Sequence, residues 1–165
     1  MTDFARLMSD YFVKYLAGQK GSGSNTMKTY RDTFVQLLEF MDEKKHIRAD
    51  CIEVDSFSYD IINEFLEYLE KEKRVSISTR NNRLAAIRSF FKYTGYHEPK
   101  YLNISTSIRE ISKKKTEGRQ MNYLSVNAME HFLNSFDKTD HKELRCFCIV
   151  LLLYESGARV TELCN

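Results

Sequence analysis

The sequence predicts an all-α protein, and three observations support this. Only one of the 165 residues is proline, and 29% are charged, a composition typical of a mostly helical chain. In several segments, apolar residues also recur with the i, i+3, i+4, i+7 spacing of a helix that buries one face. With 42% hydrophobic residues, the chain can build real cores in one or two small domains.

The first two helices are predicted over residues 4–16 and from residue 24 onward. The apolar side chains of the first helix are Phe4, Leu7, Met8, Tyr11, Phe12, Tyr15 and Leu16. Residues 18–24, GQKGSGS, are typical of a flexible loop. We expect Ser24 to cap the second helix, whose buried stripe is Tyr30, Phe34, Leu37, Leu38 and Met41.

Two more helices with opposite charge follow. Ser58 is expected to cap the third, which buries Ile61, Ile62, Phe65, Leu66 and Leu69. Its other face carries Asp60, Glu64, Glu67 and Glu70, so it should point away from any bound anion. We expect Ser78 to cap the fourth helix, Gly95 to end it, and its core face to be Leu84, Ile87 and Phe91.

The remaining chain divides into three parts. A short fifth helix is expected within residues 101–111, after Pro99. Residues 112–122, SKKKTEGRQMN, are charged and poor in apolar residues, which is typical of a linker between domains. Beyond it, Ser125 should cap a helix with Met129, Phe132, Leu133 and Phe136 inside, and residues 144–155 should form a buried helix.

The net charge of +2 does not by itself indicate a nucleic-acid partner, but one segment is strongly one-sided. Residues 73–92 contain six Lys or Arg and no acid. Arginines and asparagines on an exposed helix suit phosphates and base edges. The candidate DNA-binding residues of this helix are Thr79, Arg80, Asn81, Asn82, Arg83, Arg88 and Lys92. A solvated basic face remains the alternative.

Two flanking segments offer similar groups. The start of the second helix combines small donors, a cation and helix N–H groups in Asn25, Thr26, Lys28 and Thr29. Simple capping explains these residues equally well. The predicted linker adds Lys113, Lys114, Lys115 and Arg119, although linkers are often basic for solubility alone.

A third pattern lies near the end of the sequence, in LLLYESGARVTELCN, residues 151–165. Gly157 can end the preceding helix, because glycine adopts positive φ without steric cost. Arg159 would then lie at a new helix start, where it could hold a phosphate with two parallel hydrogen bonds. Glu162, three residues later, could fix its rotamer. Spacing alone favours an ordinary surface Arg–Glu pair.

Four stretches together resemble the tyrosine recombinases, also called the phage integrase family. LLLYESGARVTELCN resembles the first active-site box, Gly-x-Arg-x-x-Glu, here Gly157, Arg159 and Glu162. Residues 24–41 and 78–95 resemble the family's N-terminal DNA-binding domain, and residues 122–133, NYLSVNAMEHFL, the entry to the catalytic domain. Each match is weak alone, but four in the family's order are specific.

The resemblance implies a SAM-like core DNA-binding domain over residues 1–111, a linker over 112–122 and the start of a truncated catalytic domain over 123–165. It implies double-stranded DNA as partner, with other protomers in a tetramer. The parent enzyme would use no cofactor or metal, and would cut and rejoin DNA through a 3′-phosphotyrosyl bond. Arg159 would be catalytic, with Glu162 supporting it.

The family's other catalytic groups, including its nucleophilic tyrosine, would follow residue 165. We therefore expect the fragment to be inactive, and to form a dimer or stay partly disordered beyond Tyr123. A stand-alone helical module that binds DNA, or only protein, is the alternative. Four cysteines without a CxxC pair, no signal peptide and no membrane-length apolar run indicate a cytoplasmic protein.

Overall fold

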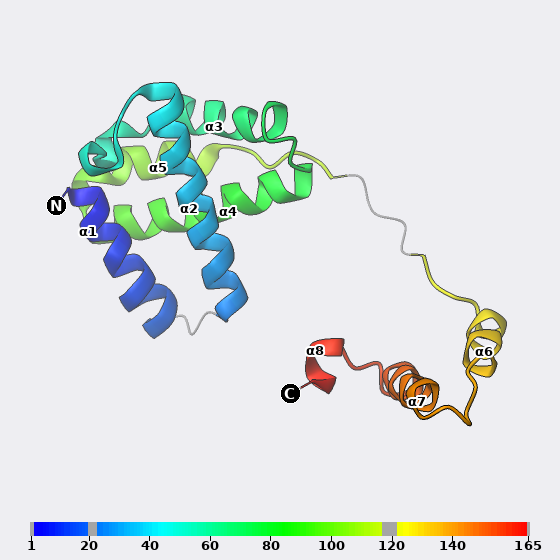
Figure 1. The fold of residues 1–165 in the computed structure, drawn as a ribbon. Coiled ribbons are helices and arrows are strands. Elements are labelled where there is room, and N and C mark those ends of the chain that lie inside the picture. Colours follow the sequence, from blue (N-terminus) through cyan, green and yellow to red (C-terminus); the bar gives the residue numbers. More distant parts are fainter. Residues whose placement is uncertain (1, 20–22, 117–121, 165) are drawn as a thin grey trace. The chain divides into compact units, whose positions relative to one another are not determined.

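Residues 2–19, 23–116 and 122–164 are described by a computed structural model, and every regular element within these ranges is a helix (Figure 1). The chain divides into two compact units, Met1–Glu117 and Gly118–Asn165. The prediction of an all-α fold is confirmed.

The larger unit is built around α4, which contacts α2, α3 and α5. In Figure 1, α2 crosses α4, and α5 lies along it. The α1 helix continues directly into a π-helix, η1, and short 3₁₀ helices join the later elements. The bounds are α1 Asp3–Asp10, η1 Tyr11–Gln19, α2 Ser24–Lys45, η2 Ala49–Cys51, η3 Val54–Ser56, α3 Tyr59–Lys71, α4 Ile77–His97, η4 Pro99–Tyr101 and α5 Leu102–Glu110.

Two of the predicted helix caps are wrong by one or two residues. The Ser58 side chain accepts a hydrogen bond from the Ile61 N–H, as predicted for α3. Ser24, however, is the first helical residue of α2, and Gly23 occupies the N-cap position without a side-chain cap. In α4 the Ser76 hydroxyl, rather than Ser78, accepts from the Thr79 N–H. Both segments hold more than one nearby serine or glycine, so the sequence did not decide which residue caps the helix.

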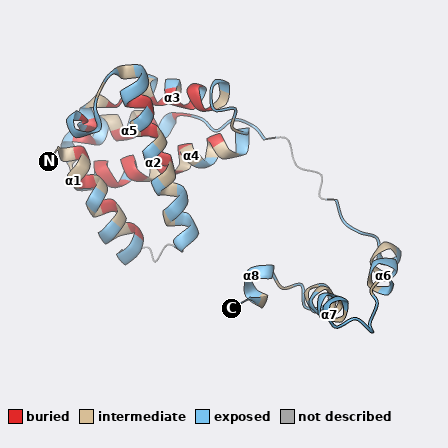
Figure 2. Cartoon of the chain, viewed as in Figure 1, coloured by how far each residue is buried: buried red, intermediate tan, exposed pale blue. Residues whose placement is uncertain are grey.

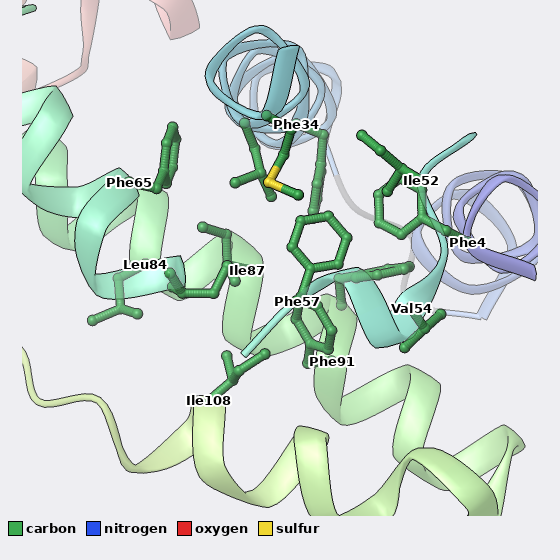
Figure 3. Close-up of a cluster of buried hydrophobic side chains, with 14 of the residues drawn as sticks. Phe4, Phe34, Ile52, Val54, Phe57, Phe65, Leu84, Ile87, Phe91 and Ile108 are labelled. Carbon is green, nitrogen blue, oxygen red and sulfur yellow. The ribbon is translucent and has the colours of Figure 1, made fainter. Parts of the chain in front are cut away.

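The core of the larger unit is rich in aromatic rings, and its buried side chains line the inner faces of α1 to α5 (Figure 2). The Phe90 ring lies 5.3–5.5 Å, centroid to centroid, from the rings of Phe4, Tyr11, Phe34 and Phe91, in edge-to-face arrangements. Figure 3 shows Phe4, Phe57 and Phe91 together in this cluster. The predicted apolar stripes of the first four helices contribute most of these residues.

Gly95 was predicted to end α4, but the helix continues to His97. Its role is close packing. A Cβ atom at Gly95 would lie 2.6 Å from the Ser105 Oγ and 2.7 Å from the Ser105 Cβ on α5. Glycine is therefore required at this position because α4 and α5 approach each other too closely for a side chain.

We expect Gly95→Ala to lower the free energy of unfolding. Overpacking costs about 1–3 kcal/mol, which exceeds the gain of about 1 kcal/mol from replacing a helical glycine. Urea unfolding followed by circular dichroism measures the difference. In a Ser105→Gly background the clash partner is gone, so the same substitution should become neutral or stabilising. A stabilising Gly95→Ala in the natural sequence would contradict this packing role.

The smaller unit is much less buried than the sequence predicted. It contains α6 Val126–Asn134, α7 His141–Ser156 and α8 Val160–Leu163. The Ser125 side chain caps α6 as expected, but no residue of these three helices is buried. The prediction that residues 144–155 form a buried helix is thus wrong for this unit. The helices α6 and α7 and the single turn of α8 are too few to cover an apolar face. Phe132, predicted inside, is 45% exposed.

Candidate nucleic-acid interface

The starts of α2 and α4 are tied together by one arginine. The Arg83 guanidinium on α4 donates hydrogen bonds to the Thr29 carbonyl oxygen at 2.9 Å and to the Thr33 hydroxyl at 3.2 Å, both on α2. The Thr29 hydroxyl in turn donates to the Asn25 carbonyl at 2.9 Å. The structure thus brings together two candidate segments that lie more than 50 residues apart in the sequence. It also shows that Arg83 and Thr29 have structural roles.

The first turn of α2 remains open at its surface. Asn25, Thr26 and Lys28 are exposed, and no side chain caps the helix N-terminus. Helix N–H groups that point outward beside a cation suit an anion such as a phosphate. These three residues therefore keep the geometry expected of a backbone contact.

Arg80 was predicted to be an exposed DNA-binding residue, and this prediction is wrong. Its side chain is only 6% exposed, and its Nε atom lies 3.2 Å from a carboxylate oxygen of Glu70. The pair is electrostatic rather than a well-aligned hydrogen bond, since neither atom meets hydrogen-bond geometry with a partner. Another guanidinium N–H donates to the Ser112 carbonyl at 3.2 Å. The guanidinium is therefore engaged within the fold.

Asn81 is also engaged. Its side-chain amide donates to the Lys114 carbonyl at 2.8 Å and accepts from the Lys114 N–H at 3.1 Å. Lys114 reaches Glu70 with its ammonium group at 2.7 Å. We call Glu70, Arg80, Asn81 and Lys114 the clamp, because together they hold residues 112–114 against α3 and α4.

The clamp also gives one acid of α3 a role that the sequence did not indicate. The acidic face of α3 was predicted to point away from bound DNA, but Glu70 also pairs with two cations that were predicted to bind it, Arg80 on α4 and Lys114 after α5. Glu64 and Glu67 instead pair with Lys45 and Lys71. Glu70 is the last acid on α3, so it alone lies within reach of the start of α4.

The other candidate residues lie at or near the surface. Asn82, Lys92, Lys113 and Lys115 are exposed. Thr79 is half-buried and shares a hydrogen bond of 3.0 Å with Ser76. Arg88 is half-buried, and its guanidinium donates to the Arg109 carbonyl. Arg119 lies outside the described residues.

In the smaller unit, Arg159 and Glu162 adopt the predicted arrangement. Gly157 ends α7 with φ of +63°, and Arg159 takes the N-cap position of α8. One Glu162 oxygen accepts from the Arg159 N–H at 2.8 Å and the other from its guanidinium at 3.0 Å. These two bonds hold the pKa of the Glu162 carboxyl below its usual value. The Arg159 side chain is 83% exposed, so its guanidinium is accessible.

Residues 10–99 match the family described as phage integrase, N-terminal SAM-like domain, which is more than half of the chain. The chain belongs to this family. The matched residues include both segments that resembled the DNA-binding domain of tyrosine recombinases.

The curated relatives agree with this phage integrase assignment. The chain is 27% identical over 159 residues to a Sinorhizobium fredii protein named integrase/recombinase y4rC, a match that covers 96% of this chain and 48% of the relative. It is 27% identical over 160 residues to tyrosine recombinase XerC of Staphylococcus aureus, covering 96% of this chain and 50% of the relative. The chain spans about half the length of these relatives. No solved structure matches it.

Within this integrase domain, sequence reasoning missed the partners of the basic residues. Glu70, Ser112 and the carbonyl of Arg109 do not differ in type from their neighbours, so no sequence signal marks them. Two tyrosines, Tyr15 and Tyr30, also lie beside Arg88 and Lys92, although the sequence placed them only in the core.

The described parts of this integrase chain show neither a metal-binding cluster nor a membrane-spanning helix. Residues 2–19, 23–116 and 122–164 hold no group of three His, Cys, Asp or Glu side chains arranged to bind a metal ion. In the same ranges, no helix is long and apolar enough to cross a membrane.

Proposed function

We propose that this chain is the DNA-binding N-terminal portion of a site-specific tyrosine recombinase that acts in the cytoplasm on a mobile element. Its core DNA-binding domain would comprise residues 1–111, with a linker over residues 112–122 and the start of the catalytic domain over residues 123–165. The family membership and the basic face of α2 and α4 support this proposal.

The observation that carries the DNA-binding role is the pairing of two helix starts. The Arg83 bridge sets the exposed first turn of α2 beside the basic α4. An exposed helix N-terminus together with exposed cations offers a duplex backbone more phosphate contacts than either would alone. Lys28 on α2 and Lys92 on α4 are exposed, and each would supply an ammonium group to the DNA backbone.

In the parent enzyme, Arg159 would stabilise charge during strand cleavage. When a tyrosine attacks the scissile phosphate, negative charge gathers on the equatorial oxygens, and a guanidinium aimed at them lowers the barrier. Glu162 would hold that guanidinium in place through the two bonds described above. The phosphotyrosyl link conserves the phosphodiester energy, so rejoining is the reverse attack. No tyrosine of this chain is assigned the nucleophilic role.

Assembly with other protomers is part of the same proposal. The smaller unit exposes large apolar side chains, including Tyr123 at 90% and Leu124 at 60%. Exposed apolar groups of this size favour a partner surface. A tetramer on DNA for the parent, and a dimer of this chain alone, are the assemblies that we propose.

We expect the chain to bind duplex DNA with a steep salt dependence. Fluorescence anisotropy with a labelled duplex, over a salt series, measures it. Lys28→Gln and Lys92→Gln should each reduce the slope of log K against log[salt] by about 0.9, the value for one lost phosphate contact. These residues are better choices than Arg83 and Arg88, whose guanidinium groups bond within the fold.

Lys71→Gln is the matched control, because Lys71 is an exposed lysine on the acidic helix α3. It should leave the slope unchanged. If the chain failed to bind duplex at low salt, or if Lys71→Gln weakened binding as much as Lys92→Gln, the DNA face would not be where we place it.

A further inference from the structure

Beside the basic face, α4 borders a hollow of about 500 Å³ that is lined by four cations. They come from α4, α5 and the segment after α5, and no acidic side chain lines the hollow. The cations are Arg88, Lys92, Arg109 and Lys113, and the other lining residues are Tyr15, Tyr30, Ala85 and Ser89. Four positive charges around one cavity favour a polyanion.

A second hollow of about 330 Å³ adjoins the first and is mainly aromatic. It is lined by Tyr15, Lys92, Tyr93, Tyr96 and His97. Because Tyr15 and Lys92 line both hollows, the two form one groove with a basic half and an aromatic half. The negative charge of Asp10 lies near Tyr93 and helps to raise the pKa of its hydroxyl. Lys14 offsets this charge, because its ammonium group lies 2.7 Å from the Asp10 carboxylate.

Tyr15, which lines both halves of the groove, lies in an uncommon type of helix. Tyr15 belongs to the π-helix η1, and its ring stacks on Tyr11 at 5.6 Å and lies 5.3 Å from Tyr93. π-Helical turns are rare and are frequently found at functional sites. The Tyr93 ring is braced by His97 at 4.2 Å, whereas Tyr96 is 86% exposed. The groove thus has a fixed aromatic wall and one ring open to solvent.

The two halves together point to a specific ligand. Cations track a phosphodiester backbone, and open aromatic rings stack on bases, which is the combination found in proteins that bind single strands. In a duplex the bases are already stacked and paired, so an aromatic half would have nothing to hold. We propose that this groove binds single-stranded DNA, with phosphates along the four cations and one unstacked base on the Tyr96 ring.

This inference rests on the proposed function only in taking DNA as the partner. The duplex face uses the first turn of α2 and the exposed polar residues Asn82 and Lys92 of α4. The groove adds Arg109, Tyr96 and His97, none of which belongs to that face. Binding of a duplex and binding of a single strand can therefore be separated by substitution.

The test compares Tyr96→Ala with Tyr96→Phe in the 165-residue chain, using a labelled thymine oligonucleotide of about 12 nucleotides, a length within the usual site sizes. Tyr96→Ala should weaken single-strand binding about 5- to 150-fold, the effect of losing one stacked base. Tyr96→Phe should retain the affinity, because the ring remains. With 2-aminopurine in the oligonucleotide, binding should quench its fluorescence, and Tyr96→Ala should reduce that quenching.

A second variant tests the basic half. Arg109→Gln should reduce the salt slope of single-strand binding by about 0.7 and leave duplex affinity unchanged. The Arg109 side chain is exposed and its carbonyl, which accepts from Arg88, is kept, so the fold should survive. Circular dichroism confirms folding for each variant.

The outcomes distinguish this inference from the proposed function. Duplex binding together with single-strand binding that Tyr96→Ala leaves unchanged would overturn the groove and keep the duplex face. Single-strand binding that depends on Tyr96 and Arg109, without any duplex binding, would support the groove and overturn the duplex face. If neither DNA bound at low salt, both would be wrong.

Discussion

Replacing Arg80 with methionine should lower the free energy of unfolding of the larger unit by about 2–3 kcal/mol. Removing one partner of a buried ion pair usually costs about 3–5 kcal/mol. Here the cost is smaller, because Glu70 is 22% exposed and keeps its 2.7 Å pair with Lys114. Methionine preserves most of the side-chain volume, so the loss reports on the charge and hydrogen bonds rather than on a cavity. Urea unfolding measures it.

The same substitution should also loosen the segment after α5. The Arg80 guanidinium donates to the Ser112 carbonyl, and this bond is lost in Arg80→Met. Asn81→Ala removes both bonds to the Lys114 backbone but keeps the ion pair. We therefore expect faster amide hydrogen exchange at residue 114 in both variants, with a large loss of stability only in Arg80→Met.

The matched control is Lys71→Met on α3. Lys71 pairs with Glu67 at 2.7 Å, but its side chain is 75% exposed, and an exposed pair contributes at most about 1 kcal/mol. If Arg80→Met were no more destabilising than Lys71→Met, or left exchange at residue 114 unchanged, the clamp would not hold this segment. The clamp thus holds the segment through which the chain leaves the helices of the larger unit.

Replacing Phe90 with alanine should have the largest effect on stability, about 3–5 kcal/mol. The Phe90 ring is fully buried and contacts four other aromatic rings. Its removal would leave a cavity, and it would also remove edge-to-face contacts that each contribute about 0.5–1.5 kcal/mol. Since whole domains are stable by only about 5–15 kcal/mol, this one change could consume much of the total. Urea unfolding of the purified variant checks it.

Two variants bracket this result. Phe90→Leu keeps an apolar side chain in the core and should cost clearly less than Phe90→Ala. Phe132→Ala removes a ring that is 45% exposed on α6, so it should change the free energy of unfolding by less than about 1 kcal/mol. A Phe90→Ala variant as stable as Phe90→Leu would show that the core repacks around the missing ring.

Helix formation in this protein follows closely from local sequence. The apolar spacing located α1 to α5, and most side chains of their predicted stripes are buried or half-buried. Ser58 and Ser125 cap the helices that they were predicted to cap. The Arg159–Glu162 bond was also predictable, because three residues along a helix bring two side chains within reach.

In the smaller unit, apolar spacing predicted a helix correctly but did not predict its burial. The sequence predicted α7 as a buried helix, and its apolar spacing is real, yet the helix has no buried residue. Periodicity identifies the face that a helix could bury, whereas burial requires a second layer to cover that face.

The sequence by itself determined the helices, the family and the supply of basic residues on α4. Only the tertiary structure decided which cations face solvent. Arg80 and Arg83 look alike in the sequence, yet both are bonded inside the fold, to groups that lie 32 and 54 residues away. Likewise, Gly95 resembles a helix end but serves a close contact with Ser105. Helical periodicity fixes the side of the helix on which a residue lies, whereas its partner depends on which distant backbone packs there.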